Sequence, residues 1–590
     1  MDVKERIAAL RNEMRVEEIS AYIIPSSDNH QSEYFEDHWK SRQWLSGFTG
    51  SAGTLVVTME KAGLWTDGRY FIQAEKQLNN TGIKLFKMGI PGFPTYREWL
   101  LSELNNEDVV GFDGKVYSSQ DFDLLKDQFY EKEIGFIANN DLVDRIWLDR
   151  PKLSKNKLRI QDIKFAGKSR HKKIEEIREK MRLKKADIYF LSSLDDIAWA
   201  LNIRGNDIDA FPVVDSFLII EMSKITLYLD LDKVDENSQK ILNNDGIILK
   251  KQSDICKDVN KLYGSLVYDP QKTGVYYLHC FNRKVKKIKI TDFTGMMKAV
   301  KNNIEIDNLK KTCLKDSVAV TKFLYWVDTS YDKMELSELS VSEKLLEFRK
   351  QIEDFQGVSF TTIAAYGENA AMMHYAPKKD SNAEIKAGNF LLVDSGGQYP
   401  GGTTDVTRTV VIGNVSNEAK RHFTLVVKGY IGINRAVFLE GTRGCNLDIL
   451  AREPIWQEQI DYKCGTGHGV GFNLMVHEGP HRLNQALIDV PFIEGMIITD
   501  EPGIYLEGKH GIRIENDLLV KNYGQTESGK FLNFEVLNFI PIDIDAIISE
   551  LLTFEEKKFL NEYHQQVWEK ISPYLDDDER KWLEKKTQNV

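Results

Sequence analysis

Apolar and polar positions alternate over short stretches in the first half of the chain, and these stretches predict a mixture of helices and strands. The segment "MDVKERIAALRNEMRVEEIS" is charged throughout and has the spacing of an amphipathic helix. The apolar run "AYIIPSS" predicts a short buried strand, and "AGTLVVTMEKAGLWTDGRY" predicts two strands joined by a turn. This part of the chain is therefore expected to have an α/β fold.

A similar order of elements recurs about 165 residues later. There "DIYFLSSLDDIAWALNIRG" and "SFLIIEMSKITLYLDLD" follow the order of "AYIIPSSDNH", "RQWLSGFTG" and "GTLVVTMEKAGLWTDGRY". We interpret this weak internal repeat as two related N-terminal domains.

Domain boundaries are expected where the apolar periodicity lapses, in the linker-like segments 148–160 and 283–303. A chain of 590 residues is long enough for about three domains. We therefore predict domains at 1–152, 153–298 and 299–590.

The net charge of −11 argues against a nucleic-acid partner, because binding to phosphate backbones needs a basic face. No apolar run reaches the roughly 18 residues of a membrane span, and no secretion signal is visible, so a cytoplasmic protein that does not bind membranes is expected. The odd number of cysteines, with no C-x-x-C pair, predicts reduced thiols: Cys256, Cys280, Cys313, Cys445 and Cys464.

The last third of the chain alternates long helices with glycine-rich, strand-like segments that carry an acidic residue or a histidine at an apolar edge. These segments are "FLLVDSGG", "TTDVTRTV", "GTGHGVG", "IITDEPG" and "GIRIEND". Taken singly, Asp394 could cap a turn, His468 could be a hydrogen-bonded core histidine, and Glu515 could belong to a salt bridge. Taken together, they indicate a shared site.

Local patterns suggest how these residues converge. A return strand after the turn at Pro400 could bring Asp405 opposite Asp394, so that one hairpin presents two carboxylates. Strand alternation places Arg513 and Glu515 on one face of "GIRIEND". In "IITDEPG", Glu501 lies where a strand meets a proline, which cannot continue a ladder.

Four carboxylates and one imidazole in an apolar pocket would repel one another unless cations were bound. Hard oxygen ligands with a single nitrogen favour Mn²⁺, Mg²⁺ or Zn²⁺, and bridging carboxylates commonly hold two such ions. The sequence therefore predicts a site for two divalent metal ions.

These residues also carry a family resemblance. The motifs "DSGGQYPGGTTDVTRT", "GTGHGVG", "DEPGIY" and "GIRIEND" resemble the dinuclear site of the pita-bread metallopeptidases, and most closely that of the three-domain Xaa-Pro aminopeptidases, or aminopeptidase P. The resemblance extends to "HWKSRQWLSGFTGSAGT", "GLWTDGRYFIQA" and "DDIAWALNIRG" in the N-terminal half. It implies an α/β (α+β) fold class, with two creatinase-like N-terminal α/β domains followed by a C-terminal pita-bread catalytic domain.

The resemblance implies metal ligands and their roles. Asp405 and Glu515 would bridge two ions, Asp394 would bind one of them, and His468 and Glu501 would bind the other. Mn²⁺ is the expected metal, with Zn²⁺ and Co²⁺ as alternatives. A hydroxide that bridges the metals would attack the peptide carbonyl, and Glu501 would also manage the proton.

The resemblance also implies substrate residues. His374 and His477 would line the substrate site and act in catalysis. Arg513 would orient the carboxylates without binding a metal ion itself. Cys464 stands where many relatives have a histidine that helps to form the proline subsite. The implied substrates are peptides with proline in second position, and a homodimer is expected.

Two alternatives remain open from the sequence. A prolidase would share the same five ligands but would cleave Xaa-Pro dipeptides, and the long N-terminal region favours the aminopeptidase. A non-catalytic pita-bread protein would bind partners instead, but such proteins typically lose ligands, and here all five are present.

Overall fold

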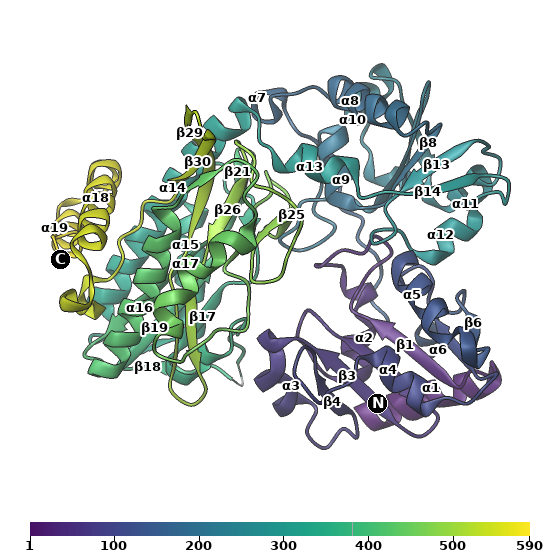
Figure 1. Cartoon of the computed structure of the whole chain (residues 1–590), viewed down its shortest axis with the longest axis horizontal. Helices are drawn as coiled ribbons and strands as arrows, with labels where there is room; N and C mark the ends of the chain where they lie inside the picture. The colour runs from purple at the N-terminus through teal and green to yellow at the C-terminus, as the bar shows by residue number, and fades with distance from the viewer. Residues whose placement is uncertain (380) are drawn as a thin grey trace. The chain divides into compact units, whose positions relative to one another are not determined.

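The computed structural model describes residues 1–379 and 381–590. Within these ranges the chain forms two compact units, and Figure 1 shows the first in purple to teal and most of the second in green to yellow. The first unit comprises Met1–Gln161 and Lys168–Thr294, and the second comprises Asp162–Gly167 and Gly295–Val590. The predicted boundaries of three domains stay a prediction.

The first unit contains two six-stranded sheets, and the first of them has the strand order β4-β3-β2-β1-β5-β6. Its strands are β1 (Ala21–Pro25), β2 (Thr54–Thr58), β3 (Ala62–Thr66), β4 (Lys84–Lys87), β5 (Val109–Phe112) and β6 (Gly135–Ile137). Strands β1, β2 and β3 are antiparallel, whereas β4, β5 and β6 each run parallel to their neighbour. Helix α1 (Val3–Val16) buries Ile7, Leu10 and Met14 in the core of this half, which confirms the predicted amphipathic helix.

The second sheet repeats this topology, with the strand order β12-β11-β10-β8-β13-β14 and the same pattern of parallel and antiparallel pairs. Its strands are β8 (Ile188–Leu191), β10 (Ser216–Glu221), β11 (Ile225–Leu229), β12 (Ile247–Lys251), β13 (Ser265–Tyr268) and β14 (Lys286–Lys289). Helix α8 (Arg170–Leu183) corresponds to α1 in chain order. The internal repeat predicted from the sequence is thus confirmed.

The linker-like segment 283–303 contains the edge strand β14 and the helix α13 (Phe293–Ala299), and the division between the two units falls within α13. The expectation of five reduced thiols was wrong. Cys256 and Cys280 form a disulfide, whereas Cys313, Cys445 and Cys464 are not disulfide-bonded. This pairing depends on the packing of α11 (Ile255–Val259) against α12 (Val275–Cys280), which a spacing of 24 residues does not reveal.

The second unit contains a three-stranded sheet, β17-β19-β22, and a six-stranded sheet, β23-β30-β29-β26-β24-β25. The strands of the first are β17 (Ile363–Tyr366), β19 (Asn389–Ser395) and β22 (Val406–Ile412). Those of the second are β23 (Val437–Leu439), β24 (Gly467–Gly469), β25 (Glu478–Leu483), β26 (Ile497–Asp500), β29 (Asn516–Thr526) and β30 (Gly529–Val536). All ladders within these two sheets are antiparallel.

Long helices, drawn from teal to yellow in Figure 1, pack against these strands and against one another. They are α14 (Asn303–Ser330), α15 (Glu338–Lys350), α16 (Asn417–Asn434), α17 (Gly444–Trp456), α18 (Phe554–Ile571) and α19 (Asp577–Lys586). Asn302 and Glu305 form a capping box that fixes the start of α14. One core cluster joins α14 and α15 to the three-stranded sheet, and a second joins α16, α18 and α19 to β28 (His510–Arg513).

Every helix in the described ranges is too short or too polar to traverse a lipid bilayer. The predicted mixture of helices and sheets is confirmed, and the residues with candidate chemistry all lie in the second unit.

Candidate metal centre

Asp394 and Asp405 lie at the ends of two paired strands, but they are not directly opposite each other. Asp394 on β19 pairs with Thr407 on β22, and Asp405 precedes the first residue of β22. The sequence prediction of an Asp394–Asp405 pair was wrong because residues 397–403 form a ladder of their own, β20 (Gly397–Tyr399) with β21 (Gly402–Thr403). Since Asp405 is two residues from Thr407, strand alternation still turns it toward the same face.

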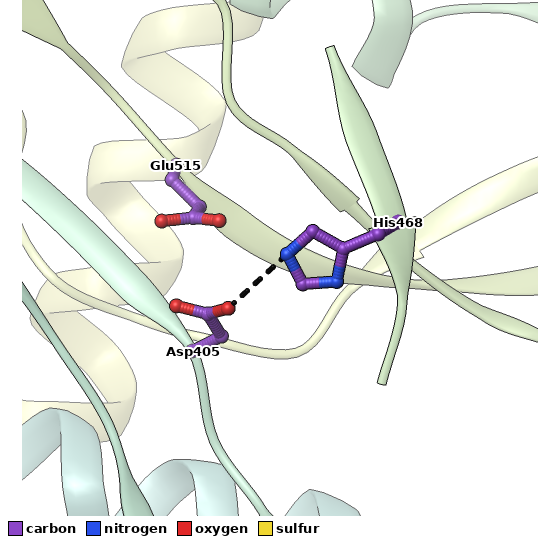
Figure 2. Close-up of side chains that lie close together, drawn as sticks. All are labelled: Asp405, His468 and Glu515. Atoms are coloured by element: carbon purple, nitrogen blue, oxygen red, sulfur yellow. Dashed lines mark ion pairs between the residues drawn. The ribbon is translucent and has the colours of Figure 1, made fainter. Parts of the chain in front are cut away.

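His468, Glu501 and Glu515 come from three neighbouring strands of the six-stranded sheet. His468 is on β24, Glu501 directly follows β26, and Glu515 directly precedes β29. His468 Nε2 lies 3.5 Å from Asp405 Oδ2 and 3.5 Å from Glu501 Oε1. Candidate ligand atoms of Asp405, His468 and Glu515 all lie within 4.8 Å of one another, and Figure 2 shows these three side chains pointing toward one point.

Arg513 connects these carboxylates, as alternation in "GIRIEND" predicted. Its neighbours Ile512 and Ile514 are buried in the core, so Arg513 and Glu515 share the opposite face. Arg513 Nη2 donates to Asp394 Oδ2 at 2.6 Å and Nε donates to Thr407 Oγ1 at 3.1 Å. Thr407 Oγ1 in turn donates to Glu515 Oε2 at 2.6 Å.

Tyr505 and Thr407 are site residues that the sequence analysis missed. Tyr505 lies on β27 (Gly503–Leu506), the strand that pairs with β28. Its hydroxyl accepts a hydrogen bond from Arg513 Nη1 at 2.7 Å. Only the hairpin between Tyr505 and Arg513, signalled by the polar "LEGKHG" turn, could have indicated this contact.

The cluster is electrostatically strained without a cation. Burial raises the pKa of Asp405 and of Glu515 well above the ordinary value of each, and the charges of Asp394 and Glu501 raise both further. Burial also raises the pKa of Glu501 to about 7, although Arg513 opposes the rise. One guanidinium therefore does not balance these carboxylates.

The residues fit divalent metal ions. Asp394 Oδ1 and Asp405 Oδ1 are buried and have no hydrogen-bond partner among the described residues. A buried carboxylate oxygen without a partner is costly, and a metal ion satisfies it together with the excess negative charge. Carboxylate oxygens with one imidazole nitrogen suit Mn²⁺ or Zn²⁺.

The three predicted substrate residues differ in their contacts with the carboxylate cluster and its surroundings. The His477 ring lies 4.4 Å, centroid to centroid, from the His468 ring, and its charge opposes the rise in the pKa of Glu501. His374 is half-buried, and the carbonyl of its neighbour Met373 accepts from Arg513 Nη2 at 3.4 Å. Cys464 is half-buried and packs against the same core cluster as Tyr505. Their roles toward a substrate stay predictions.

A buried polar network holds the residue before Asp405, and no motif in the sequence indicates it. Asp316 on α14 accepts from Arg349 Nε at 2.8 Å and Nη2 at 3.0 Å, from the Tyr399 hydroxyl at 2.6 Å, and from Thr404 Oγ1 at 3.1 Å. Because Thr404 directly precedes Asp405, this network fixes the backbone that presents the carboxylate.

A second buried ion pair lies next to His477. Lys301 Nζ donates to Glu478 Oε1, and both side chains are 1% exposed. Glu478 begins β25, which pairs with β24 and thereby sets His477 beside His468.

Comparison with known proteins agrees with this architecture. Two models of the creatinase/prolidase N-terminal domain match residues 6–146 and 149–305, the model of metallopeptidase family M24 matches residues 307–522, and the model of the C-terminal region of peptidase M24 matches residues 530–590.

Relatives cover the chain from end to end. A probable Xaa-Pro aminopeptidase P from Aspergillus flavus is 37% identical over 100% of this chain and 93% of its own length. Aminopeptidase P2 from Arabidopsis thaliana is 39% identical over 96% of this chain and 85% of its own length. The solved X-prolyl aminopeptidase from Caenorhabditis elegans, a cytosolic enzyme with a di-nuclear active site, matches with a TM-score of 0.96 at 33% identity and covers 100% of both chains.

The repeated N-terminal sheets and the buried carboxylate–imidazole cluster thus belong to a metallopeptidase of family M24. Within that family the chain belongs to the Xaa-Pro aminopeptidases, also called aminopeptidase P. The predicted fold class, two creatinase-like domains followed by a pita-bread domain, is confirmed.

Proposed function

We propose that the protein is a metal-dependent aminopeptidase that releases the N-terminal residue from peptides with proline in second position. The observation that carries the proposal is the convergence of Asp405, His468 and Glu515 within 4.8 Å, with Glu501 in contact and Asp394 held beside them by Arg513. All five carboxylate and imidazole positions of the predicted set are present in one buried cluster.

Asp405 and Glu515 are proposed to bridge two divalent ions, most simply Mn²⁺, with Asp394 on one ion and His468 and Glu501 on the other. Two bound ions would supply an activated water and polarise the scissile carbonyl. The positions support this assignment, because Asp405 lies within reach of His468 on one side and its free Oδ1 is buried.

The chain's own groups would hold and move protons and orient the reactants. Glu501 is proposed to take a proton from water and return it to the leaving imino nitrogen of proline. Arg513 and Tyr505 keep the Asp394 carboxylate in place. His477, beside His468, is proposed to donate toward the developing oxyanion, and His374 is proposed to line the same substrate site.

Activity measured beside metal content tests this function. Protein stripped with a chelator should lose hydrolysis of a Xaa-Pro tripeptide and regain it with Mn²⁺, and Asp405→Asn should lose both activity and bound metal. A fully active protein without metal would contradict the proposal. Rapid cleavage of Xaa-Pro dipeptides with inert tripeptides would show a prolidase, and full metal loading without hydrolysis of either would show a binding protein.

We also propose a cytosolic homodimer, supported by the family resemblance and by the cytosolic relative in Caenorhabditis elegans. Light scattering measures the oligomeric state. Fractionation of lysed cells tests the location. Recovery of the protein in the cytosolic fraction would support it, and recovery in a secretory fraction would contradict it.

A further inference from the structure

Two buried histidines contact each other away from the carboxylate cluster. His422 lies on α16 and His510 begins β28, and each is 6% exposed. His422 Nδ1 lies 3.0 Å from His510 Nε2, so one ring donates a hydrogen bond to the other. The ring of Phe390 packs edge-on against His510, so one wall of this site is apolar.

The surroundings of both imidazoles favour the neutral form. Burial lowers the pKa of His422, and it lowers the pKa of His510 to about 4, with His422 itself adding to that fall. The charged groups that face the pair are Glu418, Arg421, Glu458 and Lys509. A neutral imidazole is the form that binds a metal ion.

A third donor lies one helical turn away. Glu418 precedes His422 by four residues on α16, and residues at this spacing share one helix face. Its carboxylate pairs with Lys509 at 2.9 Å, and the two side chains are 57% and 53% exposed. Exposed ion pairs contribute little stability, so the Glu418 side chain would give up little by leaving Lys509 and turning toward the histidines, as binding an ion there requires.

We propose that His422, His510 and Glu418 form a Zn²⁺ site that is separate from the dinuclear centre. Two imidazole nitrogens and one carboxylate oxygen are a common Zn²⁺ donor set, with water as the fourth ligand. Bonds of about 2.0–2.1 Å in tetrahedral geometry place two nitrogens about 3.3 Å apart. The observed 3.0 Å therefore needs an opening of only a few tenths of an ångström.

A bound ion would join α16 to β28, the strand that continues to Arg513 and its contact with Asp394. Because the two histidines are far apart in the unfolded chain, Zn²⁺ would bind the folded state preferentially and stabilise it. The site does not depend on peptidase activity.

Metal content per chain tests the site directly. Protein saturated with Zn²⁺ and freed of excess by gel filtration should hold one more ion per chain in the wild type than in His422→Gln or His510→Gln. The exposed histidine on α8 provides a matched control, and His171→Gln should retain the wild-type count. If the dinuclear assignment failed, the number of bound ions per chain would be lower by the same amount in the wild type and in every variant. Equal numbers of bound ions in wild type, His422→Gln and His510→Gln would overturn this proposal.

Two exposed variants keep the test independent of core packing. Competition with a chromophoric chelator should show about 10-fold weaker Zn²⁺ binding at this site in Glu418→Gln, and tighter binding in Lys509→Gln, which releases the carboxylate from its partner. A purely structural histidine pair would leave the Zn²⁺ affinity of both variants at the wild-type value, and that result would also overturn the proposal.

Discussion

Arg513 and Asp394 form a buried ion pair between β28 and β19, with Nη2 of the arginine 2.6 Å from Oδ2 of the aspartate and side chains that are 3% and 11% exposed. The same guanidinium also donates to Thr407 and to Tyr505. It therefore orients Asp394 through one contact and Glu515 indirectly through Thr407.

Replacing Arg513 should weaken metal binding more than it unfolds the protein. Arg513→Met is expected to lower Mn²⁺ affinity 10- to 100-fold, because outer groups that orient metal ligands typically contribute that much. Arg513→Lys should be intermediate, since lysine keeps the charge but loses the planar fork of donors. Isothermal titration calorimetry measures both variants against Arg182→Met, a control at an exposed arginine on α8. Wild-type affinity in Arg513→Met would contradict this role.

His477→Ala should reduce kcat on the order of 100-fold or more while metal content stays at the wild-type level, because a single lost donor to an oxyanion has an effect of this size. Its ring lies against that of His468, 4.4 Å between centroids, so metal analysis must accompany the kinetics. A fall in bound metal that matches the fall in kcat would assign His477 to metal binding. Unchanged kcat would leave it only a structural role.

Cys464→His should raise kcat/KM for a Xaa-Pro tripeptide, if Cys464 lines the pocket that receives proline. A thiol cannot reproduce the hydrogen bonds of an imidazole. The position packs beside Tyr505, and its carbonyl is held by Arg452 Nη2 at 2.7 Å, so the backbone should tolerate the change. Cys445→Ser serves as the control thiol. Unchanged kcat/KM in both Cys464→His and Cys464→Ser would remove this residue from the proline subsite.

Lys301→Met should destabilise the protein by about 3–5 kcal/mol, because it leaves the buried carboxylate of Glu478 without its cation. The double variant Lys301→Met with Glu478→Met should recover most of that loss, since two apolar side chains leave no uncompensated charge. Urea unfolding gives these free energies. Additive losses in the double variant would show that the two residues do not stabilise each other.

Metal affinity and stability should depend on pH through Glu501. Its folded pKa of about 7 lies above the unfolded value of 4.5, so the metal-free folded state holds a proton that the unfolded chain releases. This contribution, up to about 3 kcal/mol, is fully present below pH 4.5 and is lost as the pH rises through 7. Metal affinity should rise over the same range, because protons and metal compete for the carboxylate.

Urea midpoints of the metal-free protein at pH 5.5, 7 and 8.5 measure this dependence, and calorimetric titration with Mn²⁺ at the same pH values measures the affinity. Glu501→Gln should make the dependence of stability on pH less steep, and the remaining dependence would come from Asp405 and Glu515, whose pKa values are also raised. A metal-free protein that becomes more stable between pH 5.5 and 8.5 would contradict the assignment.

The candidate ligands could be predicted from the sequence because each breaks a local rule. An acidic residue at the end of an apolar strand, as with Asp394, needs a partner, and five such exceptions in one region indicate a common site. The repeat of the N-terminal domains was visible for a similar reason, since the order of apolar runs survives where individual residues differ.

The remaining features depend on contacts between distant segments. The register that pairs Asp394 with Thr407 is set by the ladder of β20 with β21, and Lys301 reaches Glu478 across 177 residues. The Cys256–Cys280 pair and the His422–His510 contact likewise follow from helix packing and have no signature in spacing. Asp316, which anchors the backbone before Asp405, looks in sequence like any polar residue of a helix.

The five candidate ligands lie in or next to five separate strands between Asp394 and Glu515, and the last of them directly precedes β29. On the ribosome, the growing chain therefore lacks a complete ion-binding cage until Glu515 has left the exit tunnel. Ion uptake would then be a late maturation step, because a chain whose synthesis stops before that residue contains both N-terminal sheets and four of the candidate ligands yet lacks the Glu515 carboxylate.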